Sequence, residues 1–150
     1  MKNLIFSKYN SIEPKGAIGI QKCGIIFWQK TGFLHHCNKL AFQSMISLIK
    51  KKYAPTSVQI NGNVCFIQFD NDENKIIYLS LKKKRYSKYK FIYGESHTAY
   101  VNAEFHLFAL EIVSYIAKNI GSKFYVDDAT GYLEHGSKEK LEQYIKNCDI

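Results

Sequence analysis

Three groups of residues have side chains that could support metal or acid-base chemistry, and the first of them is His35-His36-Cys37. Imidazole and thiolate groups are the usual ligands of zinc, but a zinc site normally draws on a second pair of ligands elsewhere in the chain. The sequence offers no second pair at a suitable spacing. We therefore interpret this cluster as part of a loop or the start of a helix, without a metal.

The second group contains the two histidines near the longest helical segment, His97 and His106. Either could work as an acid or base with Glu95, Glu104 or Cys65. Helical spacing alone does not bring His97 to Glu104, and Glu104 and His106 point to different faces of a helix. A histidine on a mostly apolar helix is usually a hydrogen-bonded structural residue, so we expect no catalysis here.

The third group is acidic and consists of Asp127, Asp128 and Glu134, which bracket a turn. Carboxylates are ligands for magnesium, but adjacent residues in a strand point to opposite faces. At most one of the two aspartates could therefore join Glu134 in a site. Acidic residues beside a turn more commonly accept hydrogen bonds from the backbone, and we expect a structural role for them.

Motifs for nucleotide cofactors and for nucleophilic catalysis are absent from the sequence. It contains no P-loop, and the glycines at positions 16, 19 and 24 do not have the spacing of the dinucleotide-binding pattern G-x-G-x-x-G. It also contains no serine in a nucleophile-elbow pattern. The sequence therefore predicts no catalytic residue, no cofactor and no metal, and it favours a protein that is not an enzyme.

A basic stretch at residues 82 to 90, with the sequence KKKRYSKYK, is the strongest local feature. The chain has 21 Lys and Arg against 13 Asp and Glu, and the net charge of +8 attracts nucleic acid, acidic proteins and anionic membranes alike. Cations between tyrosines can bind phosphates and stack on bases, but a charged edge strand or a solvated loop has the same composition. The candidate partner-binding residues are Lys82, Lys83, Lys84, Arg85, Tyr86, Lys88, Tyr89 and Lys90.

The placement of the other charges bears on the kind of partner. The two helices expected in the second half of the chain expose mixed charges, so no long basic groove that could follow a phosphate backbone is evident. A short patch suits an acidic protein surface, where it accelerates association. We therefore expect an acidic protein partner, with nucleic-acid binding as the first alternative. The second alternative is a small metal-dependent nuclease built on Asp127, Asp128 or the histidines.

Hydrophobic periodicity and turn residues predict the elements that must position these groups. The clearest is a hairpin of strands at 64–69 and 75–83, joined by the turn DNDEN at 70–74. Helices are predicted at 38–53, before Pro55, at 99–120, before Gly121, and after Ser137. Further strands are predicted within 16–29, near 89–93, and as a second hairpin at 123–128 and 132–135.

These elements predict one α+β domain over residues 1–150, with a mainly antiparallel sheet packed against about three helices. The chain starts without the long apolar region of a secretory signal, and no stretch approaches the length of a membrane span. Its cysteines, at positions 23, 37, 65 and 148, form no C-x-x-C pair and lie near apolar residues. We therefore expect a cytoplasmic protein with buried, reduced thiols and no membrane partner.

The segment 103–135, in which a long apolar helix leads through Gly121 into KFYVDDATGYLEHG, resembles the small immunity proteins of bacterial contact-dependent inhibition and other polymorphic toxin systems. The enrichment of the chain in Lys, Ile, Asn and Tyr is similar to theirs. The resemblance carries over no functional residues. It implies a binding module that neutralises one cognate toxin domain, often a nuclease, by covering its active site or its substrate-binding surface.

Overall fold

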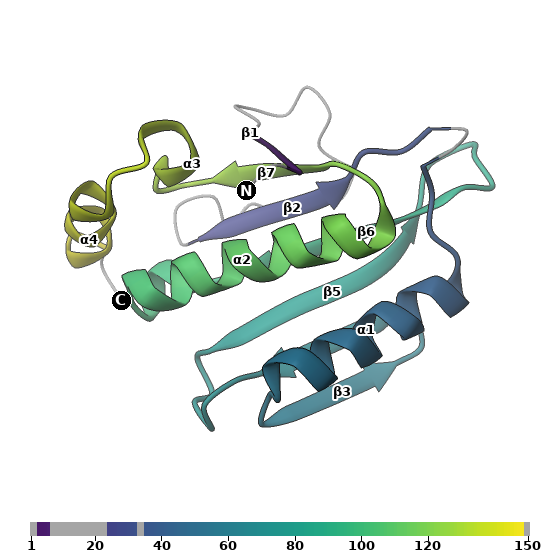
Figure 1. The fold of residues 1–150 in the computed structure, drawn as a ribbon, viewed down its shortest axis with the longest axis horizontal. Coiled ribbons are helices and arrows are strands. Elements are labelled where there is room, and N and C mark those ends of the chain that lie inside the picture. Colours follow the sequence, from purple (N-terminus) through teal and green to yellow (C-terminus); the bar gives the residue numbers. More distant parts are fainter. Residues whose placement is uncertain (1–2, 7–23, 33–34, 149–150) are drawn as a thin grey trace.

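The structure, a computed structural model, describes residues 3–6, 24–32 and 35–148. Within these ranges seven strands form one sheet in the order β1-β7-β2-β6-β5-β4-β3 (Figure 1). Every neighbouring pair is antiparallel except β1 and β7, which are parallel. The strands are β1 (Leu4–Phe6), β2 (Ile25–Gln29), β3 (Ser57–Asn61), β4 (Val64–Gln68), β5 (Ile76–Lys83), β6 (Lys90–Ser96) and β7 (Phe124–Asp128).

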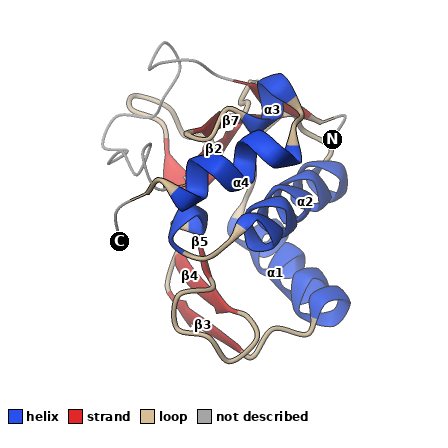
Figure 2. Ribbon diagram, turned by 90° about the vertical axis from the view of Figure 1, so that its left-hand side faces the viewer, coloured by secondary structure: helices blue, strands red, loops and turns tan. Residues whose placement is uncertain are grey.

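The two long helices, α1 (Lys39–Tyr53) and α2 (Ala103–Ile120), lie side by side on one face of the sheet (Figures 1 and 2). A short 3-10 helix, η1 (Thr98–Tyr100), precedes α2, and two further helices, α3 (Tyr132–His135) and α4 (Lys138–Lys146), follow β7. Together these elements make a single α+β domain with a mostly antiparallel sheet, as the sequence predicts.

Alternation along the strands divides the apolar side chains between the two faces of the sheet. The face under α1 and α2 holds the main core, in which Ile77 and Leu79 of β5 pack with Ile46 of α1 and Ile112 of α2. The opposite face holds a smaller, mostly aromatic cluster of Ile26, Trp28, Phe91 and Tyr93, with Tyr78 and Tyr125 packed against it. Both faces of the central strands are therefore buried.

Hydrogen-bonding caps define the ends of the helices, and those at Gly121 and Ser137 lie where the sequence predicts them. Asn38 and Asn102 accept hydrogen bonds at the starts of α1 and α2, and Ser137 accepts one from the backbone of Lys140 at the start of α4. Gly121 ends α2 in the left-handed conformation, at φ 75°. The prediction of this terminus is confirmed, whereas α2 begins four residues later than predicted because η1 occupies residues 98–100.

The hairpin predicted at 64–83 is confirmed, because β4 and β5 pair in antiparallel register from Val64 with Ser80 to Gln68 with Ile76. The second predicted hairpin, at 123–135, is wrong. Residues 132–135 form the helical turn α3, and β7 pairs with β1 on one side and with β2 on the other. A strand with neighbours on both sides has no free edge, so residues 132–135 cannot pair with it.

Two short strands were not predicted, β1 at Leu4–Phe6 and β3 at Ser57–Asn61. The segment Ser57–Asn61 alternates polar and apolar side chains, a strand signal that the prediction did not use, whereas Leu4–Phe6 is too short to show a period. Both strands lie at the edges of the sheet. Of the strand region predicted within 16–29, the structure places β2 at Ile25–Gln29. Residues 16–23, including Cys23, lie outside the described ranges.

Candidate functional site

A buried polar network joins the end of β7 to the first turn of α2. His106 Nε2 lies 3.1 Å from Asp128 Oδ1, and neither side chain is exposed to solvent. The hydroxyl of Thr130 donates to Asp128 Oδ1 at 2.6 Å, and the hydroxyl of Thr98 lies 2.6 Å from His106 Nδ1. Four side chains, from η1, α2, the last residue of β7 and the turn after it, therefore meet in one place.

The carboxyl group of Asp128 is kept ionised by its hydrogen bonds. Burial alone would raise its pKa, but the hydrogen bond and charge of His106, together with hydrogen bonds from the Thr130 side chain and backbone, hold the pKa of Asp128 below its ordinary value. Its second oxygen accepts from the backbone of Leu133 at 3.3 Å. The hydrogen bond from the Thr130 backbone, at 2.9 Å, is the turn interaction that the sequence predicts for this acidic pair.

A His-Asp pair can orient a base for catalysis, but this one has no access to a substrate. Both ring nitrogens of His106 lie within hydrogen-bonding distance of Thr98, Asp128 or Thr130, and all four side chains are buried. The predicted partners Glu95, Glu104 and Cys65 take no part. The network is suited to fastening α2 to η1 and to the turn that leads into α3.

The other metal and acid-base candidates do not assemble either. In the part of the chain that the structure describes, no three His, Cys, Asp or Glu side chains form a group that could hold a metal ion. Asp127 and Asp128 are neighbours in β7, and Asp128 is buried on the helix-covered side, whereas Asp127 is half-buried. Burial and the nearby charge of Asp128 raise the pKa of Asp127. Glu134 is exposed on α3.

The three residues of the His35-His36-Cys37 cluster make different local contacts and do not face one common site. His36 stacks on Tyr89 with ring centroids 4.9 Å apart, and the backbone of His35 pairs with Gly32. Cys37 is buried, as is Cys65, and burial raises the pKa of each thiol to about 11. These two thiols therefore stay protonated at neutral pH and are poor nucleophiles.

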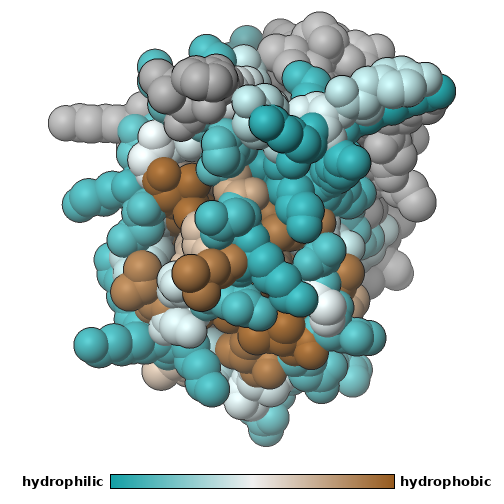
Figure 3. Space-filling view, turned by 90° about the vertical axis from the view of Figure 1, so that its right-hand side faces the viewer, coloured by the Kyte–Doolittle hydropathy of each residue, from teal (hydrophilic) through white to brown (hydrophobic). Residues whose placement is uncertain are grey.

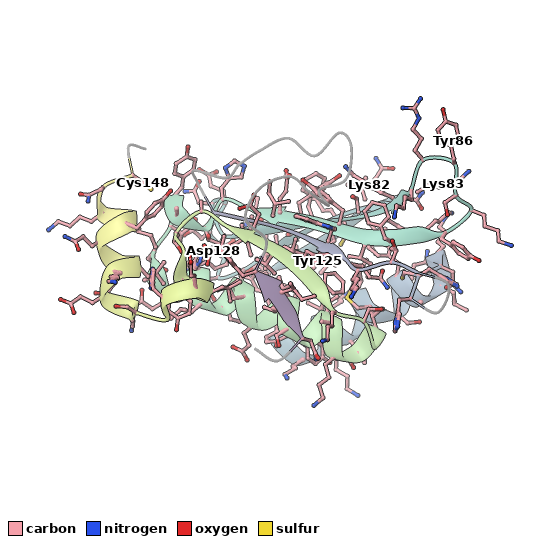
Figure 4. All side chains as sticks on the ribbon, turned by 90° about the horizontal axis from the view of Figure 1, so that it is seen from above. Lys82, Lys83, Tyr86, Tyr125, Asp128 and Cys148 are labelled. Carbon is pink, nitrogen blue, oxygen red and sulfur yellow. The ribbon has the colours of Figure 1, made fainter. Side chains whose placement is uncertain are left out.

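The basic stretch at 82–90 forms the end of the hairpin between β5 and β6, which extends beyond the rest of the sheet (Figures 1 and 4). Both strands are internal to the sheet, since β5 also pairs with β4 and β6 also pairs with β2. The interpretation of this stretch as a charged edge strand is therefore wrong. It comprises the end of β5, the turn after it and the first residue of β6, and it lies far from Asp128 (Figure 4).

The structure divides the predicted binding residues into two sets. Lys82, Tyr89 and Lys90 are half-buried: Lys82 lies over the ring of Tyr93 at 4.2 Å, and Tyr89 is the stacking partner of His36. The remaining five are exposed and are called the exposed tip: Lys83, Lys84, Arg85, Tyr86 and Lys88. Among the described residues, the four cations of the exposed tip form no ion pair.

The turn that carries the exposed tip has a defined conformation. The backbone of Ser87 donates to Lys84 at 3.1 Å, and the backbone of Tyr89 donates to the Ser87 hydroxyl at 3.0 Å. Tyr86 is 92% exposed and adopts φ 61°. This left-handed conformation is unfavourable for any residue other than glycine. The guanidinium of Arg85 lies 4.9 Å from the centre of the Tyr86 ring. Tyr86 is therefore presented to solvent in a strained, positively charged turn.

Comparison of the chain with protein-family models, with curated proteins and with solved structures gave no match. No helix within the described residues has the length and apolar character needed to cross a bilayer.

Proposed function

We propose that this protein is a binding module that covers an acidic surface of a protein partner with the exposed tip. The observation that carries the proposal is the projection of one exposed tyrosine, Tyr86, and four cations that form no ion pair with described residues, from the end of a central hairpin. Arginine and tyrosine are, with tryptophan, the residues enriched at the energetic centres of protein interfaces. The sheet behind the hairpin and the hydrogen bonds of the turn order the backbone of the tip before binding, which lowers the backbone entropy lost on binding.

The resemblance of residues 103–135 to immunity proteins suggests the class of partner. We propose that it is a toxin domain with an acidic contact surface, which the protein neutralises in the cytoplasm by direct binding. Catalysis by this chain is a weaker hypothesis, because the His106–Asp128 pair is closed to solvent and fully hydrogen-bonded. Binding requires only a complementary surface.

Nucleic-acid binding through the same tip is the second candidate, and one observation favours it. Arg85 lies over Tyr86, and Lys88 Nζ lies 5.8 Å from the centre of the Tyr89 ring, so cations and aromatic rings alternate as they do on surfaces that bind single strands. Titration of labelled single- and double-stranded oligonucleotides at two salt concentrations separates the candidates. Tight binding to unrelated sequences, with a steep salt dependence that vanishes when the tip is altered, would favour nucleic acid.

The test of the proposed function uses the product of the gene next to this one as the candidate toxin. Coexpression of this protein with the candidate toxin should restore growth of cells that the toxin inhibits. The triple variant Lys83→Glu, Lys84→Glu, Arg85→Glu should slow association of the two proteins about tenfold or more at low salt, with a smaller effect on dissociation. The reason is that charges at the rim of an interface mainly steer the encounter.

A control with the same change in charge is Lys51→Glu, Lys140→Glu, Lys146→Glu, in which all three residues are exposed on α1 or α4. It should leave the association rate within about twofold of the unaltered protein. Equal slowing in both triple variants would show that only net charge matters and would refute the role of the tip.

A further inference from the structure

Beside the exposed tip, the chain forms a second basic feature from residues that are far apart in the sequence. It lies where β2 and α2 end and β7 begins, on the right of Figure 1. A hollow of about 430 Å³ opens there and is lined chiefly by Asn3, Lys30, His35, Lys118, Ser122 and Lys123. Figure 3 faces this end of the molecule and shows hydrophilic side chains covering much of it between apolar patches. We call this site the basic hollow.

The charges of the basic hollow are uncompensated within the described chain. The ammonium groups of Lys30, Lys118 and Lys123 form no ion pair or hydrogen bond with described residues, and no described acidic residue lines the hollow. Lys30 and Lys123 are held beside each other, because the backbone of Lys30 donates to the carbonyl of Lys123 at 2.9 Å. Like charges that are brought together repel, and a bound anion relieves that repulsion.

A buried hydroxyl group adds a hydrogen-bond donor to the lining. Ser122 is only 7% exposed, and its Oγ accepts a hydrogen bond from Gln29 Nε2 at 3.0 Å. The amide of Gln29 is fixed in this orientation, because its oxygen accepts from the backbone of Ile92 at 3.2 Å. The hydroxyl proton of Ser122 has no acceptor among the described residues, so it is available to a ligand in the hollow.

We propose that the basic hollow binds an oxyanion of the phosphate class, either free or as part of a small phosphorylated molecule. A phosphate group offers several acceptor oxygens and a charge near −2, which matches three ammonium groups and a hydroxyl donor. The carbonyl end of α2 contributes about half a negative charge, which is small against three full positive charges. The volume of about 430 Å³ leaves room for a group attached to the phosphate.

The test measures binding of inorganic phosphate and of pyrophosphate by calorimetry and ³¹P NMR. The unaltered protein should bind both, and pyrophosphate more tightly, because it presents more charge to the same lysines. The hollow variant, Lys30→Gln, Lys118→Gln, Lys123→Gln, should weaken pyrophosphate binding about tenfold or more, since it removes three charged contacts. All three lysines are exposed, so the fold should be retained, with circular dichroism as the check.

The matched control is the tip variant, Lys83→Gln, Lys84→Gln, Lys88→Gln, which removes the same charge from the same end of the molecule. It should keep pyrophosphate affinity within about twofold. Equal weakening in both variants, or no binding of either anion by the unaltered protein, would overturn the proposal. Binding of oligonucleotides but not of the small anions through the hollow would also overturn it. Failure here leaves the proposed function intact, because that function is measured with a protein partner and with variants of the exposed tip.

Discussion

At the scale of single residues, Asp128 is an ionised group held in the interior. The buried charge is tolerated because hydrogen-bond donors surround its carboxyl oxygens. His106, Thr130 and the backbone of Leu133 all lie within 3.3 Å of its oxygens. Removing one partner from such a network leaves buried polar groups unsatisfied, which costs about 1 to 3 kcal/mol and more where a charge is involved. The pKa of Asp127, its neighbour in β7, is shifted in the opposite direction, because burial and the charge of Asp128 raise it.

The two aspartates should therefore give pH effects of opposite sign. The folded pKa of Asp128 lies below its ordinary value of 3.8, so its contribution to stability is present above that value and is lost as the pH falls through the folded pKa. Asp128→Ala should lower the unfolding free energy at neutral pH by about 3 kcal/mol and flatten its acid dependence. Urea denaturation over a pH series measures both effects.

The control for this prediction is Asp127→Asn. The folded pKa of Asp127 is raised, so its contribution to stability is lost as the pH rises through that pKa, and the ionised group is unfavourable at neutral pH. The control should keep or slightly increase stability at neutral pH. A decrease in unfolding free energy as large as that of Asp128→Ala would contradict the opposite pKa shifts of the two carboxyl groups.

At the scale of elements, α1 ends in a conformation that its sequence does not favour. Ala54 is the residue after the last helical position and adopts φ 44°, ψ 57°, with its backbone donating to Lys50. Pro55 prevents the helix from continuing. Left-handed conformations favour glycine, because any other side chain there crowds the backbone. The turn into β3 therefore sets the end of α1, and the left-handed conformation of Ala54 costs some conformational free energy.

Ala54→Gly should raise the unfolding free energy by about 0.5 to 1 kcal/mol, since glycine adopts the left-handed region without that crowding. The same substitution in the first turn of the helix, Ala41→Gly, should lower it by about 0.5 to 1 kcal/mol. Thermal and urea denaturation of the two variants measure the contrast. A loss of stability in Ala54→Gly would show that the entropy of the unfolded chain outweighs the relief of strain at this position.

At the scale of the whole molecule, charge is distributed unevenly over the sheet. Residues 55–69, which include the edge strand β3 and its neighbour β4, contain no charged side chain, although the chain as a whole has a net charge of +8. Ile60 in β3 is 50% exposed. An uncharged edge strand with an exposed apolar residue favours pairing with other chains. Repulsion between like-charged molecules opposes such pairing at low salt.

Self-association should therefore increase as salt screens the net charge, and Ile60→Lys should suppress it, because a charge on the edge opposes strand pairing. The matched control is Leu40→Lys, which also replaces an exposed apolar residue, 73% exposed on α1, by a lysine. Light scattering at low and high salt gives the comparison. Equal suppression by both substitutions would attribute the association to general apolar contacts and not to the edge of the sheet.

Local patterns in the sequence determined much of the architecture. The β4–β5 hairpin, the three longer helices and their caps depend on residues close together in the chain, such as Asn102 and Gly121 at the ends of α2. The exposed tip also comes from one continuous stretch, so its composition is visible in the sequence. The turn hydrogen bond between Asp128 and Thr130 belongs to the same class, because the two residues are only two positions apart.

Tertiary structure alone decided the rest, because strands pair wherever a free edge is available. The insertion of β7 between β1 and β2 excluded the second predicted hairpin. The same arrangement places Asp128 against His106 and brings Lys123 beside Lys30. No local signal marks either pairing, since each joins segments that are distant in sequence. The closed polar network and the basic hollow are therefore consequences of the order of the strands.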